Sequence, residues 1–293
     1  MTRVNAKRVL VTGGTRGIGE IIASKLAQKG AHVVVWGRDP ARLEATLRRL
    51  ERAGGSAEGQ LCDVADRVAV YDAARELKQR GGSIDVLVNN AGIVSGKPFL
   101  ELTDEEIERT LQVNTLAHFW TAKAFLPDMV MANQGHLVTI SSAAGLVGVA
   151  GLTDYCASKF AAFGFHEALR LELRKLHSRV KTTVVCPYYV DTGMFAGVRT
   201  RFSALLPILK PEDVAQAVVR AIEKNQARVL MPRIVYSIPL FRLVPVPVMD
   251  LAADALGLNA SMDSFVGRGE GEPPEAERPK PRRPRRHVVA HAR

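Results

Sequence analysis

Short apolar runs rich in β-branched residues alternate with longer amphipathic segments along most of the chain. The apolar runs lie at 9–11, 33–35, 61–64, 86–88, 137–140 and 183–185. Segments with 3.6-residue periodicity lie at 19–29, 40–53, 66–79, 104–131, 153–176 and 211–224. Uniformly apolar strands are typical of a parallel sheet that helices cover on both faces. The alternation predicts a single α/β domain with a doubly wound parallel sheet and right-handed crossovers.

Two of the predicted helices carry clear start signals. Asp39 precedes Pro40, which is the order of an N-cap and a first helical residue. Thr103 is followed three residues later by Glu106, the spacing of a capping box. We expect these two helices to begin at these residues.

The pattern changes after residue 231. The segment at 233–258 is apolar but is interrupted by Arg233, Pro239, Arg242, Pro245 and Pro247. It cannot span a bilayer as one helix, so we favour packing over a substrate pocket or the core, with contact to a membrane surface as the alternative. We divide the chain into the α/β domain at 1–232, an apolar extension at 233–266 and a basic tail, predicted to be disordered, at 267–293.

Composition and charge narrow the function classes. Hydrophobic residues make up 47% and charged residues 24%, which is ordinary for a folded soluble protein. The net charge is +10, but eight Lys or Arg against four Glu from Gly267 onward place +4 of it in the tail. Because the rest of the chain has no dense basic cluster, specific nucleic-acid binding is not expected. The tail could contact the phosphates of nucleic acid or of anionic lipid.

The cysteines and the first residues bear on location. Cys62, Cys156 and Cys186 are spaced too widely for a metal site or a small disulfide framework, so we interpret them as reduced thiols. The first residues run directly into a strand-like segment and leave no room for a signal peptide. We therefore expect a cytoplasmic protein without a metal ion.

A glycine-rich turn follows the first predicted strand and opens the first helix, over residues 12–19. Backbone N–H groups and the positive end of the helix dipole make such a turn a site for the diphosphate of a dinucleotide. The expected contacts are Thr12, Gly13, Arg16, Gly17, Ile18 and Gly19.

The end of the second predicted strand bears on the choice of dinucleotide. Related folds usually place an acid there, which binds the ribose 2′-hydroxyl and excludes a 2′-phosphate. This chain has Gly37-Arg38 instead, and Arg38 offers a two-pronged guanidinium to a phosphate, with Arg16 nearby. Asp39 is the competing acid, but its place before Pro40 makes it a helix cap. The sequence therefore favours NADP(H) over NAD(H).

Polar residues follow two further predicted strands, at the carboxyl ends where open α/β sheets bind ligands. We expect contributions to the cofactor site from Asp63, Val64, Asn90, Ala91 and Gly92. The alternative interpretation makes Asp63 a cap and the asparagines turn formers.

Tyr155 and Lys159 are four residues apart in a predicted helix, so they lie on one face. A lysine ammonium there favours tyrosinate and would lower the tyrosine pKa from its ordinary value of about 10. Ser142 ends the fifth predicted strand, where its hydroxyl could bond a carbonyl oxygen. One group could then move a proton while the other orients the substrate.

Together these motifs resemble the short-chain dehydrogenase/reductase family, in its branch of small single-domain members. The match covers Thr-Gly-x-x-x-Gly-x-Gly at 12–19, Asn-Asn-Ala-Gly at 89–92, Asn114, Ser142, Tyr155 and Lys159. The resemblance implies a Rossmann fold and an oxidoreductase in which hydride passes directly between cofactor and substrate. It implies that Tyr155 is the general acid/base, that Ser142 polarises the carbonyl, and that Lys159 binds the nicotinamide ribose and tunes Tyr155. Asn114 would hold a water that relays protons from Lys159.

The same resemblance extends to the segment after the sixth strand, residues 186–192. It takes the place of the family's Pro-Gly-x-x-x-Thr segment, which receives the nicotinamide amide, so Pro187, Val190 and Thr192 are expected cofactor contacts. Tyr188 stands where the family usually has glycine. Family members commonly form dimers or tetramers, so we expect a homo-oligomer.

A narrower resemblance is to the retinol dehydrogenase and 17β-hydroxysteroid dehydrogenase subgroup. It rests on residues 181–187, on residues 191–195 and on the proline-rich apolar C-terminal stretch. It implies lipid metabolism, with a lipophilic alcohol, ketone or aldehyde as substrate. The chain lacks the subgroup's N-terminal membrane anchor, which implies a soluble protein or one with peripheral membrane contact. It also carries Gly37 where the subgroup has Asp, which supports NADP(H).

Two points stay open from the residues alone. The apolar side chains that follow Thr192 fit a hydrophobic substrate and plain core packing equally well. A non-catalytic NADP(H)-binding sensor or scaffold would need only the cofactor residues, although the intact Asn114, Ser142, Tyr155 and Lys159 argue against it. An epimerase or dehydratase usually carries a larger C-terminal substrate domain, which we do not expect here.

Overall fold

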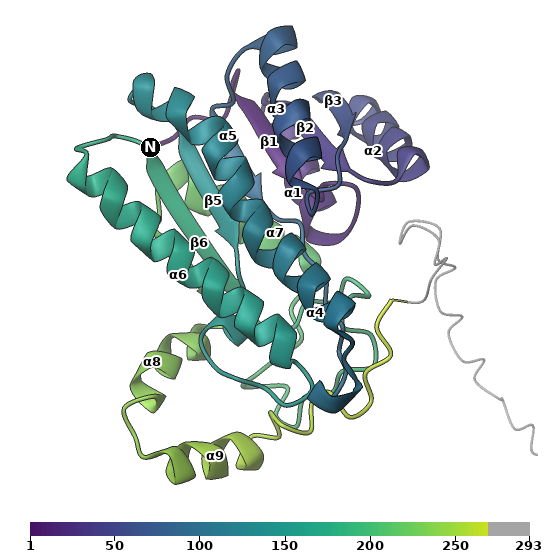
Figure 1. The fold of residues 1–293 in the computed structure, drawn as a ribbon, viewed down its shortest axis with the longest axis vertical. Helices are drawn as coiled ribbons and strands as arrows, with labels where there is room; N and C mark the ends of the chain where they lie inside the picture. Colours follow the sequence, from purple (N-terminus) through teal and green to yellow (C-terminus); the bar gives the residue numbers. More distant parts are fainter. Residues whose placement is uncertain (269–293) are drawn as a thin grey trace, which may run out of the picture.

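The computed structural model describes residues 1–268 and has a parallel sheet at its centre (Figure 1). The strands are β1 (Arg8–Thr12), β2 (His32–Gly37), β3 (Ser56–Leu61), β4 (Val86–Asn89), β5 (His136–Ile140), β6 (Lys181–Pro187) and β7 (Arg228–Met231). Their order is β3-β2-β1-β4-β5-β6-β7, so the chain starts in the middle and winds outward in both directions. The prediction of a doubly wound parallel sheet is confirmed.

Helices cover both faces of this sheet (Figure 1). They are α1 (Gly17–Gln28), α2 (Pro40–Arg52), α3 (Arg67–Gly81), α4 (Asp104–Leu111), α5 (Ala117–Met131), α6 (Thr153–Lys175) and α7 (Pro211–Lys224). Ile22 of α1 and Val218 of α7 belong to the core on one face, whereas Leu77 of α3 and Phe125 of α5 belong to the core on the other. Strands β1, β4 and β5 are buried along their whole length between these layers, which is why they are uniformly apolar.

The predicted position of the third strand is wrong. The strand is Ser56–Leu61, and most of it is partly exposed because it lies at the edge of the sheet and pairs only with β2. The apolar run predicted at 61–64 turns across the end of the sheet instead, where Cys62 and Val64 are buried. The pattern also omits β7, the opposite edge strand. A strand with one free edge does not need the uniformly apolar sequence that the prediction relied on.

The segment predicted as one helix over 104–131 is interrupted. A π turn at Gln112–Leu116 separates α4 from α5 and carries Asn114. π turns insert an extra residue into a helix without changing its polarity pattern, so periodicity does not reveal them.

The two predicted helix starts are confirmed. Asp39 Oδ1 accepts a hydrogen bond from the Arg42 amide at 3.1 Å at the start of α2. Thr103 Oγ1 accepts from the Glu106 amide at 3.2 Å, and the Glu106 carboxylate accepts from the Thr103 amide at 3.1 Å. This reciprocal pair is the capping box expected at the start of α4.

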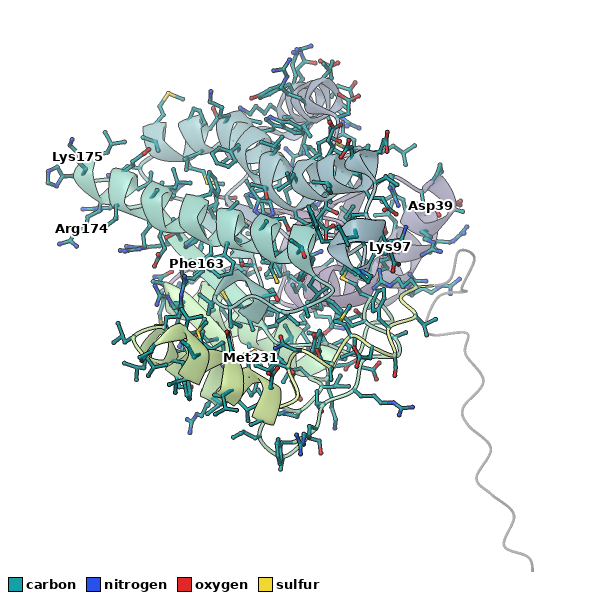
Figure 2. The ribbon with its side chains drawn as sticks, turned by 60° about the horizontal axis from the view of Figure 1, so that its bottom comes forward. Asp39, Lys97, Phe163, Arg174, Lys175 and Met231 are labelled. Atoms are coloured by element: carbon teal, nitrogen blue, oxygen red, sulfur yellow. The ribbon has the colours of Figure 1, made fainter. Side chains whose placement is uncertain are left out.

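After β7 the chain forms a 3-10 turn (Arg233–Ser237), α8 (Ile238–Phe241) and α9 (Val246–Ala255), which Figure 2 shows beside Met231. The residues that follow α9 return to the ends of the strands, where Ser261 Oγ lies 2.9 Å from Tyr189 Oη. Within residues 1–268 no helix is both long and apolar enough to cross a bilayer. The tail predicted to be disordered lies outside the described residues from 269 onward.

The cysteines lie in separate parts of this fold. Cys62 follows β3, Cys156 lies in α6 and Cys186 lies in β6. All of them are free thiols, with exposed fractions of 5%, 7% and 0% respectively.

Candidate active site

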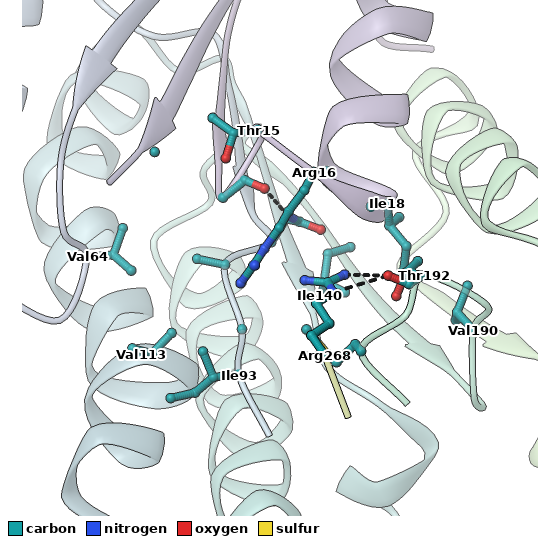
Figure 3. Close-up of a pocket in the computed structure, with 18 of the residues that line it drawn as sticks. Thr15, Arg16, Ile18, Val64, Ile93, Val113, Ile140, Val190, Thr192 and Arg268 are labelled. Carbon is teal, nitrogen blue, oxygen red and sulfur yellow. Dashed lines mark hydrogen bonds between the residues drawn. The ribbon is translucent and has the colours of Figure 1, made fainter. Parts of the chain in front are cut away.

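A cavity of about 290 Å³ opens at the carboxyl ends of the central strands (Figure 3). It collects predicted site residues from the glycine-rich turn, from the loops after β2, β3 and β4, from α6 and from the loop after β6. Those that line it are Gly13, Arg16, Gly17, Ile18, Gly19, Arg38, Asp63, Val64, Asn90, Ala91, Gly92, Ser142, Tyr155, Lys159, Pro187, Val190 and Thr192. Thr12 and Asn114 lie behind this wall and hold parts of it in place.

The glycine-rich turn is tied to the loop after β4 by side chains. Thr12 Oγ1 accepts hydrogen bonds from the Asn90 amide at 3.0 Å and from the Ala91 amide at 3.2 Å. Asn90 Nδ2 donates in return to Thr12 O at 3.0 Å and to Gly13 O at 3.2 Å. Two loops far apart in sequence therefore form one rigid edge of the cavity. Asn90 therefore ties the two loops together, and the turn-forming role that we considered for it is not seen in the structure.

The first turn of α1 suits an anionic group. Its N-cap residue is Arg16, which has no side-chain acceptor with which to cap the helix. The first residues of α1 line the cavity, so their N–H groups and the helix dipole are directed at whatever the cavity holds. A diphosphate matches this donor set.

Three arginines gather at the β2 side of the cavity: Arg16, Arg38 and Arg42. Burial lowers the pKa of Arg16, and repulsion from Arg42 and Arg38 lowers it further, so the three positive charges are close enough to interact. Asp39 is engaged as the cap of α2 and pairs with Arg42 at 3.2 Å. This cluster of positive charge could hold a dianionic phosphate.

Gly37 makes this arrangement possible. A Cβ placed on Gly37 would lie 2.5 Å from Thr15 Cγ2, so any larger residue would push the glycine-rich turn away from β2. The absence of a side chain at Gly37 thus both removes the usual acid and lets the turn that carries Arg16 pack closely.

Asp63 lies at the adjoining wall and is held by Arg109 of α4 at 2.7 Å. Burial acts to raise the pKa of Asp63, but hydrogen bonds from Arg109 and from the Ala65 amide outweigh it and lower the pKa. Asp63 is therefore an ionised acceptor beside the cavity. It also accepts from the Ala65 amide at 3.0 Å, so the alternative interpretation of Asp63 as a turn cap holds as well.

Tyr155 and Ser142 meet at the inner end of the cavity. Tyr155 is 5% exposed, and burial raises the pKa of its phenol above the ordinary value, while a hydrogen bond with Ser142 acts in the opposite direction. Ser142 also caps the short turn after β5, because its Oγ accepts from the Ala144 amide at 3.1 Å. The two hydroxyls are thus held together at a point that a substrate oxygen could reach.

Lys159 stands one helical turn from Tyr155, as predicted, and its Nζ lies 5.6 Å from the centre of the tyrosine ring. Its Nζ donates to Ile140 O at 3.0 Å, and burial lowers the pKa of Lys159 to about 8. The prediction that Lys159 lowers the pKa of Tyr155 is not met in the structure. Both side chains are buried, and the loss of solvent around the phenol dominates.

Asn114 lies in the π turn and is fully buried. Its Oδ1 accepts from the Ile93 amide at 2.8 Å, and its Nδ2 donates to Ile93 O at 2.9 Å and to Ser158 Oγ at 3.0 Å. A Cβ placed on Gly92 would lie 3.5 Å from both Asn114 Oδ1 and Lys159 Nζ. Asn114 therefore braces the loop after β4 against α6, close to Lys159.

Apolar and aromatic side chains cover Tyr155 on the substrate side. The Phe195 ring packs edge-on against Tyr155 with centres 5.7 Å apart, and Tyr189 packs against Phe195 at 5.1 Å. Of the apolar residues that follow Thr192, some line the cavity and others, such as Leu206, are buried away from it. Both interpretations of this loop therefore apply, each to different residues.

Three arginines that line the cavity escaped the sequence analysis: Arg42, Arg109 and Arg268. Arg42 lies in the first turn of α2, directly after the Asp39 cap, and its position near Arg38 in the sequence was a usable signal. Arg109 and Arg268 reach the cavity only through the path of α4 and of the C-terminal segment, which no local pattern predicts.

The fold and this site define a dinucleotide-binding oxidoreductase of the α/β class. The chain belongs to the short-chain dehydrogenase/reductase family: the family described as "short chain dehydrogenase" matches residues 7–202. It is similar to short-chain dehydrogenase/reductase family 16C member 6 of Bos taurus, with 42% identity over 90% of this chain and 85% of that protein. It is also similar to epidermal retinol dehydrogenase 2 of Homo sapiens, with 42% identity over 88% and 84%.

Solved structures agree with this assignment. A metagenomic short-chain oxidoreductase in complex with NADP has a TM-score of 0.66 and 32% identity, covering 78% of this chain and 96% of that one. An actinorhodin polyketide ketoreductase variant with NADPH has a TM-score of 0.72 and 32% identity over 80% and 99%. A family member from Burkholderia phymatum in complex with NAD has a TM-score of 0.75 and 25% identity over 86% and 97%. The predicted family and its subgroup are confirmed.

Proposed function

We propose that this chain is an NADP(H)-dependent oxidoreductase that interconverts a lipophilic alcohol and its ketone or aldehyde. The observation that carries the proposal is the joining of Ser142, Tyr155 and Lys159 at the inner end of a cavity whose outer end suits a dinucleotide. A bound nicotinamide would supply or accept the hydride.

The choice of NADP(H) rests on Arg16, Arg38 and Arg42. Their mutual repulsion favours a ligand with two negative charges, and a 2′-phosphate provides them. Asp39, the acid that could select the 2′-hydroxyl of NAD(H), is occupied as a helix cap. Two of the similar structures are complexes with NADP or NADPH and one with NAD, so the preference for NADP(H) that we propose rests on the arginines.

The proposed proton transfer depends on the protonation state of Tyr155. Its raised pKa keeps the phenol protonated at neutral pH, ready to donate to a carbonyl oxygen. Ser142 orients that oxygen through its hydroxyl. Lys159 and the bracing by Asn114 hold the ribose side of the site, so that the substrate carbon faces the cofactor.

The lipophilic substrate class rests on the lining of the inner cavity. Tyr188, Met194 and Phe195 line the cavity, and Tyr188 and Phe195 pack in the same apolar cluster as Tyr155, which suits an apolar substrate. Relatives named epidermal retinol dehydrogenase 2 and retinol dehydrogenase 10-B (Danio rerio, 40% identical) point to the same class.

The proposal is tested by binding and turnover on one preparation. NADPH and NADH are titrated against the purified protein, and oxidation of NADPH is then followed with lipophilic ketones and aldehydes, including retinal and steroids. We expect tight NADPH binding and turnover with at least one carbonyl class. Tight binding with no turnover across the panel would favour the non-catalytic sensor or scaffold, and failure to bind either nucleotide would contradict the proposal.

We also propose a cytoplasmic homo-oligomer that touches membranes peripherally through the apolar extension at 233–266. Large apolar side chains are exposed on and between α8 and α9, namely Leu240, Phe241, Leu243, Val246, Val248 and Leu251. Exposed Arg233 and Arg242 flank them, which suits an anionic lipid surface. Sedimentation with anionic and with neutral vesicles tests the membrane contact. Equal amounts of protein left in the supernatant with both kinds of vesicle would contradict it.

A further inference from the structure

The C-terminal segment, residues 258–268, forms part of the cavity wall. The Val266 and Gly267 amides donate to Ala196 O at 2.9 and 3.2 Å, which ties the segment to the loop after β6. The Phe265 ring lies directly against Gly96 in the loop after β4. The segment thus bridges two loops that border the candidate active site and ends at Arg268.

The Arg268 guanidinium lies between the two ends of the dinucleotide site. Its Nε and Nη2 donate to Thr192 O at 3.1 and 2.8 Å, as Figure 3 shows. Its Nη2 also lies 3.2 Å from where a Cβ of Gly17 would be, in the first turn of α1. Arg268 lines the same cavity as Gly17 and Thr192, so its positive charge faces the place where the helix N-terminus suits a diphosphate.

We infer that Arg268 is a cofactor-binding residue that contacts the diphosphate of the bound dinucleotide. The inference rests on the proposed function only in that a dinucleotide occupies the cavity. A guanidinium carries five N–H donors and a permanent positive charge, so it can hydrogen-bond a phosphate oxygen as well as Thr192 O, and its charge adds to that of the helix dipole. The C-terminal segment is therefore part of the nucleotide site.

Arg268 has a different role from the three arginines near β2. Arg16, Arg38 and Arg42 lie where a 2′-phosphate would bind, so they distinguish NADPH from NADH. The diphosphate is common to both dinucleotides. Loss of Arg268 is therefore expected to weaken the binding of NADPH and of NADH by the same factor.

The experiment compares Arg268→Gln with Arg174→Gln in the full-length chain. Arg174 is an exposed arginine at the far end of α6, away from the cavity, and serves as the matched control (Figure 2). Calorimetry measures Kd for NADPH, NADH, 2′-phospho-ADP-ribose and adenosine 2′-monophosphate, the last of which lacks the diphosphate. We expect Arg268→Gln to raise Kd about tenfold for the first three, the effect of one lost charge-assisted hydrogen bond, and to leave the fourth unchanged. Arg174→Gln should change none of them.

Two results would overturn the inference. Unchanged Kd for 2′-phospho-ADP-ribose with weaker NADPH binding would mean that Arg268 only holds the Thr192 loop around the nicotinamide. Equal loss for adenosine 2′-monophosphate would mean general damage to the site, and Arg268→Lys, which keeps the charge, should then recover nothing. Because all these readouts are binding constants, they test the inference even if no carbonyl compound is turned over.

Discussion

At the scale of single residues, the chemistry depends on how Tyr155 holds its proton. Burial raises the pKa of its phenol, so the hydroxyl is protonated at neutral pH and is the proton donor that a carbonyl oxygen needs. The reverse reaction needs tyrosinate, which the same burial opposes. Carbonyl reduction therefore starts from the protonated form of Tyr155, whereas alcohol oxidation starts from the deprotonated form.

Tyr155→Phe removes the hydroxyl and keeps the ring that packs against Phe195. We expect kcat for carbonyl reduction to fall by about 10²- to 10⁴-fold, the usual contribution of a general acid, with Kd for NADPH unchanged. The matched control is Tyr71→Phe, a partly buried tyrosine in α3 that packs against the core, which should keep full activity. Wild-type kcat in Tyr155→Phe would remove this residue from the proton transfer.

Arg38→Asp places a carboxylate where the 2′-phosphate is proposed to bind. We expect Kd for NADPH to rise by about tenfold or more, since a charge-assisted contact is replaced by repulsion, while Kd for NADH stays the same or falls. Arg174→Asp makes the same charge change far from the cavity. If the ratio of the two Kd values does not move in Arg38→Asp, Arg38 does not select the cofactor.

At the scale of elements, the strands that the sequence predicted correctly are those that lie inside the sheet and are buried by helices on both faces. β1, β2, β4, β5 and β6 have neighbours on both edges and helices on both faces, so the residues at the centre of each strand are apolar. The edge strands β3 and β7 lack that constraint, and the π turn changes hydrogen bonding without changing polarity. Most predicted site residues line the cavity because they follow buried strands, whereas Arg268 depends on a long-range return of the chain.

The capping box of α4 gives a test at this scale. Thr103→Ala removes the acceptor of the Glu106 amide, and we expect the free energy of unfolding to fall by about 1 kcal/mol. Urea unfolding followed by circular dichroism measures it. Ser83→Ala, at an exposed position before β4, is the control and should have no effect. Equal midpoints for the two variants would show that the cap does not stabilise the fold.

At the scale of the whole molecule, three buried histidines tie stability to pH. Burial lowers the pKa of His118 to about 3, that of His136 to about 3 and that of His166 to about 4. In the unfolded chain these rings take up a proton near pH 6.5. Below that pH the unfolded state therefore binds more protons than the folded state, and stability falls as the pH falls toward 4.

We expect each of these histidines to remove about 1.4 kcal/mol of unfolding free energy per pH unit below about 6. Both ring nitrogens of His118 lack a hydrogen-bond partner among the described residues, so His118→Leu should fold and show a shallower slope between pH 6.5 and 5. His177→Asn, at an exposed position, should keep the wild-type slope. Urea titrations at several pH values measure the slopes, and identical slopes in all three proteins would contradict the assignment.

The enclosed thiols have a practical consequence. Burial raises the pKa of Cys62 and of Cys186 to about 12 and also raises that of Cys156, so the reactive thiolate is scarce in the native protein. An alkylating reagent reacts only after the surrounding structure has opened, so the labelling rate reports how often that part of the structure opens. We expect native protein in neutral buffer to be labelled orders of magnitude more slowly than the urea-unfolded chain. Because Cys62, Cys156 and Cys186 lie in different parts of the fold, mass spectrometry of each labelled peptide would measure the opening of each part separately.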